Sequence, residues 1–75
     1  MTTHKAVEIL AEVLEECGYT ATSEVYEGSG FIKVDVTKGI GSKGTVRMRT
    51  DRDGATIQAN INGGGWQKVA RVPNE

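Results

Sequence analysis

The polar and apolar residues of this chain alternate with two different periods. Over residues 3–17, the apolar residues recur at the spacing of an amphipathic helix. The centre of the expected buried face consists of Val7, Leu10, Ala11 and Leu14. Flanking apolar residues widen this face, namely Ala6, Ile9, Val13 and Cys17. Gly18 follows directly, and glycine is the residue that most readily ends a helix in a left-handed conformation.

Beyond Gly18 the period changes to two, as in strands with one buried face. This alternation predicts strands at Thr20–Glu27, Phe31–Thr37, Thr45–Thr50, Ala55–Asn62 and Trp66–Val72. The first of these segments is either a full strand or a loop with a short edge strand. Residues 38–44 are expected to form a glycine-rich loop, and residues 51–54 a tight hairpin turn.

A helix with one apolar stripe and a sheet with one apolar face are expected to pack together. The sequence therefore predicts an α+β fold. Its N-terminal helix, about residues 3–17, covers one face of a four- to five-stranded antiparallel meander within residues 20–72. The length of 75 residues fits one small domain, 1–75. We expect Leu10 and Leu14 to be core residues.

The cysteine and histidine content limits the chemistry of the chain. Cys17 and His4 are the only residues of their types, so we expect no disulfide within the chain, no metal site and no cofactor. The sequence shows no signal peptide and no apolar run of about 20 residues. We therefore expect a cytoplasmic protein with no membrane partner.

Charge is divided unevenly along the chain. Residues 1–30 carry six Glu and one Lys, a net of −5, whereas residues 31–75 carry eight basic and four acidic residues, a net of +4. Such a division points to charged partners. The acids of the helix are expected to form a surface of their own, made of Glu8, Glu12, Glu15 and Glu16.

A basic surface is expected on the polar face of the sheet, where alternation turns Lys33, Arg47 and Arg49 outward. The candidate partner-binding residues are Lys33, Lys43, Arg47, Arg49, Gln58, Asn60 and Trp66. Basic side chains interleaved with aromatic ones on an open sheet can bind single-stranded nucleic acid. The sequence pI of about 5.8 argues against that partner, and a solvated face that discourages edge aggregation is the simpler interpretation.

The position of Trp66 depends on the register of the last strand. If Val69 faces the helix, strict alternation places Trp66 on the outer face. A bulge that shifts the register would instead bring Trp66 into the core. We expect core burial, with the outer face as the alternative.

Residues 39–46 match the glycine pattern G-x-G-x-x-G-x-V. In a dinucleotide site this pattern leads into a helix, whereas here a strand is expected to follow. In protein kinases the pattern lies between two strands, but this chain is too short for that fold. A flexible hairpin loop is therefore the favoured interpretation, with phosphate contact as the alternative.

The sequence contains no recognisable catalytic set. With one histidine, no Ser–His–acid arrangement can be assembled. Cys17 lies on the apolar face of the helix near its C-terminal end, where the dipole disfavours a thiolate. Asp51 and Asp53 have the spacing of a turn. We expect a protein that is not an enzyme.

These observations predict a non-catalytic binding protein that occludes or bridges a macromolecular partner through charged surfaces. We expect a protein partner, and the alternative is a small nucleic-acid-binding protein that uses the basic sheet face and the loop at residues 39–44. In size and architecture the chain resembles phage and plasmid accessory proteins, which include inhibitors of bacterial defence systems. That resemblance involves no residue motif.

The last expected strand also offers a free edge for pairing with a second copy, which predicts a homodimer. Lys68 and Arg71 argue against it, because charged residues on an edge strand discourage such pairing.

Overall fold

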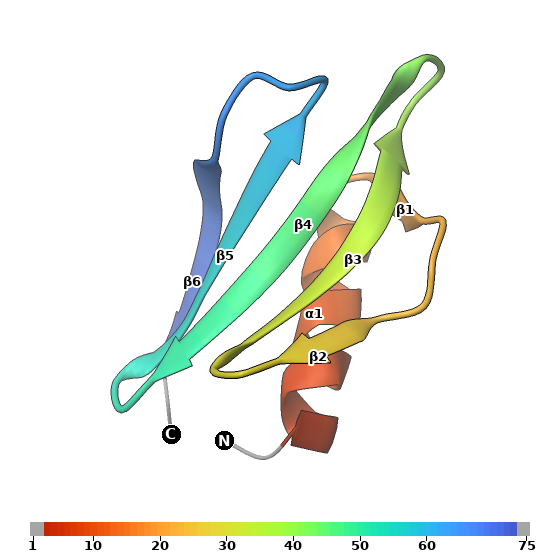
Figure 1. The fold of residues 1–75 in the computed structure, drawn as a ribbon. Helices are drawn as coiled ribbons and strands as arrows, with labels where there is room; N and C mark the ends of the chain where they lie inside the picture. The colour runs from red at the N-terminus through yellow and green to blue at the C-terminus, as the bar shows by residue number, and fades with distance from the viewer. Residues whose placement is uncertain (1–2, 74–75) are drawn as a thin grey trace.

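The computed structural model describes residues 3–73. Helix α1 (Thr3–Glu16) is followed by β1 (Tyr19–Ala21), β2 (Tyr26–Gly28), β3 (Phe31–Lys38), β4 (Ser42–Asp51), β5 (Gly54–Ile61) and β6 (Gln67–Pro73). These strands form one antiparallel sheet with α1 lying against one face of it (Figure 1). The predicted α+β architecture is confirmed, with six strands in place of the expected four or five.

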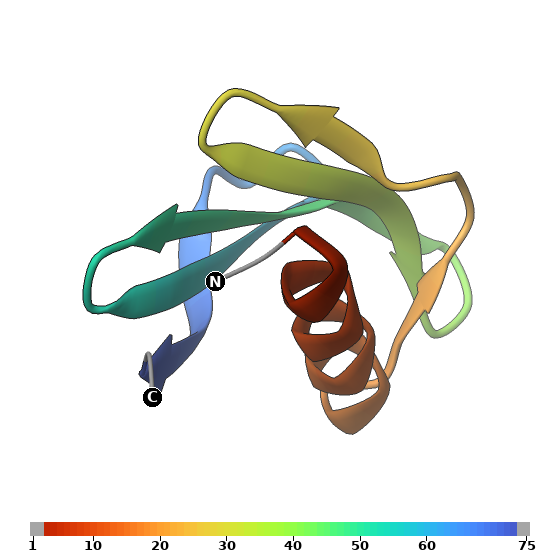
Figure 2. The ribbon, with the colours of Figure 1, turned by 90° about the horizontal axis from the view of Figure 1, so that it is seen from below.

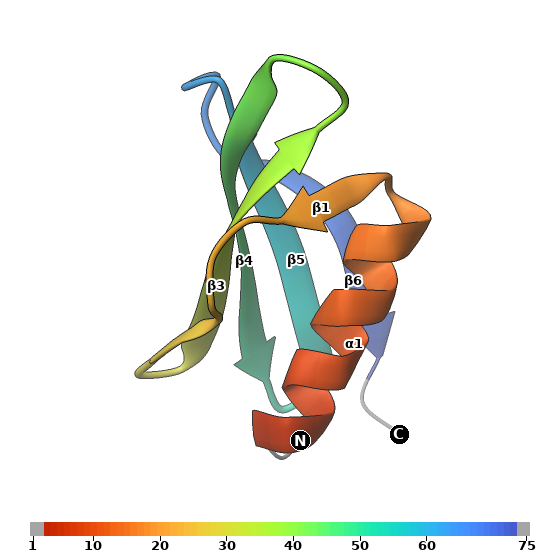
Figure 3. The same ribbon diagram turned by 90° about the vertical axis from the view of Figure 1, so that its right-hand side faces the viewer.

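Strands β3 to β6 form the predicted meander, each paired with the next. The sheet curves around α1, and its opposite face is left open (Figures 2 and 3). We call this open side the outer face. The strands that carry the central part of the outer face, β3 and β4, are therefore held from behind by the packed core.

The segment expected as one strand at Thr20–Glu27 is two short strands that share the edge of β3. Ala21 pairs with Val36 and Tyr26 pairs with Lys33, so four residues, 22–25, stand opposite two residues of β3. The break is bridged by local hydrogen bonds: Thr22 N donates to Asp35 O over 2.8 Å, and Asp35 N donates to Ser23 Oγ over 3.0 Å. Because the surplus is an even number of residues, Tyr26 still faces outward beside Lys33.

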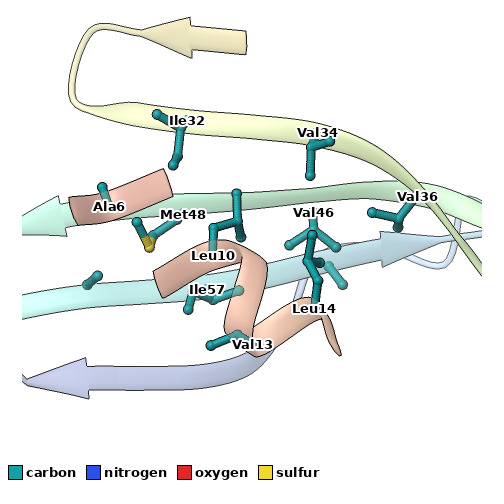
Figure 4. Packing of buried hydrophobic residues seen from close by; sticks show 12 residues of the cluster. Ala6, Leu10, Val13, Leu14, Ile32, Val34, Val36, Val46, Met48 and Ile57 are labelled. Atoms are coloured by element: carbon teal, nitrogen blue, oxygen red, sulfur yellow. The ribbon is translucent and has the colours of Figure 1, made fainter. Parts of the chain in front are cut away.

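The core is formed by one stripe of α1 and the inner face of the sheet (Figure 4). From the helix it takes Ala6, Leu10, Val13 and Leu14. From the sheet it takes Ile32, Val34, Val36, Val46, Met48, Ala55, Ile57 and Ala59. The predicted burial of Leu10 and Leu14 is confirmed, but Ala11, expected at the centre of the buried face, is exposed. The stripe is centred on Leu10 and Val13 instead, and a helical step of about 100° carries Ala11 off its edge.

The loop expected at residues 38–44 is much shorter in the structure. Strand β3 continues to Lys38 and β4 starts at Ser42, which leaves a tight turn in which Gly39 and Gly41 have positive φ angles of 65° and 88°. Gly44 is paired within the sheet, opposite Ile61. The segment 39–44 is therefore a tight turn rather than a flexible loop, because half of it already belongs to strand β4.

Strand β6 contains a β-bulge. Ile57 pairs with Ala70, but the next residue, Gln58, pairs with Lys68, so Val69 is the extra residue. Val69 and Ala70 both pack against the core as a result. The residues of β6 that precede the bulge therefore face the opposite side of the sheet from the one that unbroken alternation would give them. Lys68 is thereby brought to the outer face.

Candidate binding surface on the outer sheet face

Two neighbouring rows of side chains cross the outer face. In the first row the register joins residues of five strands: Tyr26, Lys33, Arg47, Gln58 and Lys68. In the second row it joins Phe31, Arg49, Thr56 and Arg71. We call these two rows, together with Trp66, the basic face. The side chains of the two rows are positioned by paired backbone, which gives them fixed spacing.

Two side-chain contacts hold Arg47 in place on the basic face. Its Nε donates a hydrogen bond of 3.0 Å to Oε1 of Gln58 on β5. Its guanidinium carbon lies 4.0 Å from the centroid of the Trp66 ring, within the range of a cation–π contact. Both contacts leave the two Nη groups of Arg47 without a hydrogen-bond partner in residues 3–73. Those groups are the ones that make a bidentate contact with phosphate or carboxylate.

The expected burial of Trp66 in the core is wrong, because 40% of this residue is exposed. A bulge does occur, as that expectation required, but it has the opposite effect. The last core positions of β6 are Ala70 and Val72, and unbroken alternation from them would turn Trp66 inward. The bulge at Val69 reverses this and leaves Trp66 beside Arg47 on the outer side.

Two more aromatic rings lie at the opposite edge of the basic face. The Tyr26 and Phe31 rings are 6.1 Å apart between centroids, and Nζ of Lys33 lies 5.1 Å from the Tyr26 ring. The Phe31 ring also crosses the backbone of Gly28, because a Cβ at Gly28 would collide with that ring. Glycine at this position therefore allows the Phe31 ring to lie against the end of β2.

The cations of the basic face differ in whether they are neutralised. Arg71 forms an ion pair with Asp51, with Nη2 3.1 Å from Oδ1, and donates to Thr56 Oγ1 over 2.6 Å. Within residues 3–73, no acidic side chain pairs with Lys33, Arg47, Arg49 or Lys68. A shallow hollow beside Arg49 is lined by Thr50, Asp51, Thr56 and Gln58. Four cations thus remain available to an anionic partner.

Arg71 holds the pKa of Asp51 below its usual range, chiefly through its hydrogen bonds to the carboxylate. A depressed folded-state pKa stabilises the fold above the unfolded-state value of about 3.9, and this stabilisation is lost as the pH falls through the lower folded-state value. We therefore expect Asp51→Asn to destabilise the protein slightly at neutral pH, with the difference from wild type shrinking as the pH falls below about 4 and lost only below the lowered pKa of Asp51. Urea unfolding midpoints of the variant and of wild type, taken at neutral pH and well below about pH 4, measure this difference. An equal difference at both would contradict it.

Most of the residues predicted from the sequence lie together, but two do not fit the expectation. Lys33, Arg47, Arg49, Gln58 and Trp66 share the basic face. Lys43 is separated from them along β4 by Thr45, whose hydroxyl donates to Asp35 on β3 over 3.1 Å.

Asn60 lies outside the two rows, opposite Thr45, and its Oδ1 is buried with no hydrogen-bond partner in the described part of the chain.

Lys68 was not predicted as a site residue. Its outward position depends on the bulge, for which the sequence carries no clear signal. The aromatic pair of Tyr26 and Phe31 could have been predicted in part, since alternation from Lys33 places Phe31 on the outer face.

The acidic surface lies on the other side of the molecule. Glu8, Glu12, Glu15 and Glu16 are all exposed on α1, and α1 covers the inner face of the sheet. The two predicted charged surfaces are thus separated by the core. A polyanion is attracted to one side of the protein and repelled by the other.

Among residues 3–73, no three His, Cys, Asp or Glu side chains come together in a group that could hold a metal ion. In the same range, α1 is too short and too polar to cross a membrane. Cys17 is half-buried and packs against the core.

Comparisons with protein-family models, with curated proteins and with solved structures give no match for this chain. The function of the basic face is therefore inferred from its own geometry.

Proposed function

We propose that this chain is a non-catalytic binding protein that holds an anionic macromolecular partner against its basic face. The observation that carries the proposal is the group of four cations, Lys33, Arg47, Arg49 and Lys68, that no acidic side chain of residues 3–73 neutralises. Three of them lie on the central strands β3 and β4, where the backbone is paired on both sides. A partner therefore meets a rigid array of positive charge.

The arrangement of Arg47 supports recognition rather than simple solubility. A solvated surface arginine is usually mobile, and ordering it costs side-chain entropy. Here the Trp66 ring and the Gln58 carbonyl oxygen already hold the guanidinium. Binding then requires little further ordering, which raises affinity for a given set of contacts.

The separation of charge supports a defined orientation of the bound partner. The acidic residues of α1 lie behind the sheet, and an anionic partner is steered toward the basic face by the field of the whole molecule. A partner bound in this orientation would have its own anionic surface occluded. Bridging would require a second, cationic partner on α1.

The test is a charge reversal with a matched control. We expect Arg47→Glu with Arg49→Glu to weaken binding to heparin, used as a generic polyanion, by about a hundredfold or more, because repulsion replaces attraction at the centre of the site. The control, Lys38→Glu with Arg52→Glu, makes the same change in net charge outside the two rows. Isothermal titration calorimetry at low salt measures both.

Thermal melting shows whether the variants remain folded. Arg47 and Arg49 lie outside the core, so the melting temperature should change little. Equal losses of heparin affinity in the two double variants would contradict the proposal, because net charge rather than the basic face would then explain the binding.

A further inference from the structure

We infer that the anionic partner of the basic face is single-stranded nucleic acid. This inference rests on the proposed function and adds the chemical class of the partner. It is carried by a second set of observations, the aromatic rings. Trp66 lies at the β6 side of the four cations that no acid of residues 3–73 neutralises, and Tyr26 and Phe31 lie at the β2–β3 side.

Aromatic rings beside cations form a surface suited to unpaired bases. Every base has a flat π-face that can stack on an aromatic side chain or on an arginine plane, while lysine and arginine contact the phosphates between bases. Arg47 stacked on Trp66 combines both elements in one contact, at 4.0 Å. At the opposite side, Nζ of Lys33 lies 5.1 Å from the centroid of the Tyr26 ring, a second contact between a ring and a cation.

The width of the basic face suits a short single strand of nucleic acid. The first row crosses β2 to β6, and neighbouring strands are about 4.8 Å apart, so the row is about 19 Å wide. Each row also contains a neutral polar side chain that can reach base edges, Gln58 in the first row and Thr56 in the second. The Gln58 carbonyl oxygen already accepts from Arg47, which leaves the amide group as a donor.

A duplex or an acidic protein would use this surface less completely. In a duplex the base faces are stacked on one another, so an open sheet meets only the phosphates. Carboxylates of a protein would pair with the cations but gain nothing specific from exposed π-faces. The rings at both sides of the cations therefore favour a single strand.

Overall net charge does not oppose this inference. The formal net charge is −1, but the acids of α1 lie on the far side of the core from the basic face. Over the distance between the two sides, salt screens most of their repulsion, because the Debye length is about 8 Å at physiological ionic strength. The local positive charge of the basic face therefore determines whether nucleic acid binds there.

The experiment compares four probes on the intact chain. They are an oligo(dT) and an oligo(rU) of about 12 nucleotides, a duplex of the same length, and a poly-L-glutamate peptide of similar charge. Trp66 is the only tryptophan of the chain, so its fluorescence reports stacking directly. We expect one or both single strands to bind more tightly than the duplex and the peptide and to quench Trp66. With four phosphates contacted, the logarithm of affinity should fall against the logarithm of salt with a slope of about −2.8.

Three variants separate stacking from other contacts. Trp66→Leu removes the flat ring and should weaken binding of the single strand by about 5- to 150-fold, the equivalent of about 1–3 kcal/mol for one stacked base. Trp66→Phe retains a flat ring and should restore most of the affinity. The control Ile40→Ser removes a fully exposed apolar side chain at the β3–β4 turn, outside the basic face, and should have no effect.

The outcomes distinguish the two proposals. If heparin binding depends on Arg47 and Arg49, but the duplex or the glutamate peptide binds as tightly as both single strands, the basic face stands and the inference of a single strand is wrong. Equal affinities for Trp66→Leu and Trp66→Phe would also overturn it. If no polyanion distinguishes the charge-reversal variant from its control, the proposed function fails as well.

Discussion

Leu10→Ala is expected to leave most of the protein unfolded or aggregated at room temperature. Leu10 is 1% exposed and packs from α1 onto the inner face of the sheet, near Met48 and Ile57, which are both fully buried (Figure 4). Truncating a buried leucine costs about 2–5 kcal/mol, because contacts are lost and a cavity remains. A domain has only about 5–15 kcal/mol in total, and a chain this small lies toward the lower end.

Urea denaturation followed by circular dichroism measures this loss. Glu12→Ala is the matched control, since it places alanine at an exposed position of the same helix. It also removes an acid from the C-terminal half of α1, where negative charge opposes the helix dipole. We expect the control to be at least as stable as wild type. A cooperative transition of Leu10→Ala within a few degrees of wild type would show that the helix does not depend on this contact.

The dependence on Leu10 follows from how the helix is stabilised. The first turn of α1 contains no acid and the last turn no base, so its charges do not complement the helix dipole. A helix of 14 residues is marginal in water by itself. Packing against the sheet must therefore supply most of its stability. Mutations of the sheet core are expected to destabilise the helix for the same reason.

Periodicity predicted those parts of the fold in which the spacing of apolar residues stays regular along the whole element. The helix and the alternating faces of β3, β4 and β5 are of this kind, and so are the outward positions of Lys33, Arg47 and Arg49. The burial of one face fixes the register, because a slip of one residue would turn every apolar side chain to solvent.

The features that could not be predicted are those in which an extra residue changes the pattern. The bulge at Val69 reverses Lys68 and Trp66, and the break at residues 22–25 divides one expected strand into two. Neither has a strong local signal, because both depend on which partner residue is available across the sheet. The contact between Trp66 and Arg47 is also long-range, since the two come from segments separated by the whole of β5.

The role of Gly44 could not be predicted from the sequence either. In the sequence, Gly44 ends a glycine-rich run and suggests a loop. In the structure it lies within β4, where a Cβ would collide with the carbonyl oxygen of Asn60 and approach the Cα of Ile61 to 2.8 Å. The requirement for glycine here comes from the close approach of two backbones and not from a turn.

Gly44→Ala is therefore expected to destabilise the protein, although alanine is normally the better residue inside a strand. The colliding atoms belong to the backbone of β5 and cannot rotate away, so the two strands must separate locally. Next to this point, Asn62 N donates to Lys43 O over 2.9 Å, and Lys43 N donates to Asn62 Oδ1 over 3.2 Å. Strain and loss of these bonds together should cost about 1–3 kcal/mol or more.

Gly64→Ala is the matched control for this prediction, because a Cβ there would lie 3.3 Å from the carbonyl oxygen of Ile61, a tight contact that a shift of a few tenths of an ångström relieves. We expect its urea midpoint to lie close to that of wild type and the midpoint of Gly44→Ala to be clearly lower. The same loosening of β4 against β5 should disturb the hydrogen bond between Arg47 and Gln58, so heparin affinity should fall in Gly44→Ala even at temperatures where the variant remains folded. If Gly44→Ala were as stable as wild type or more stable, β4 and β5 would have to lie further apart at this point than the structure places them.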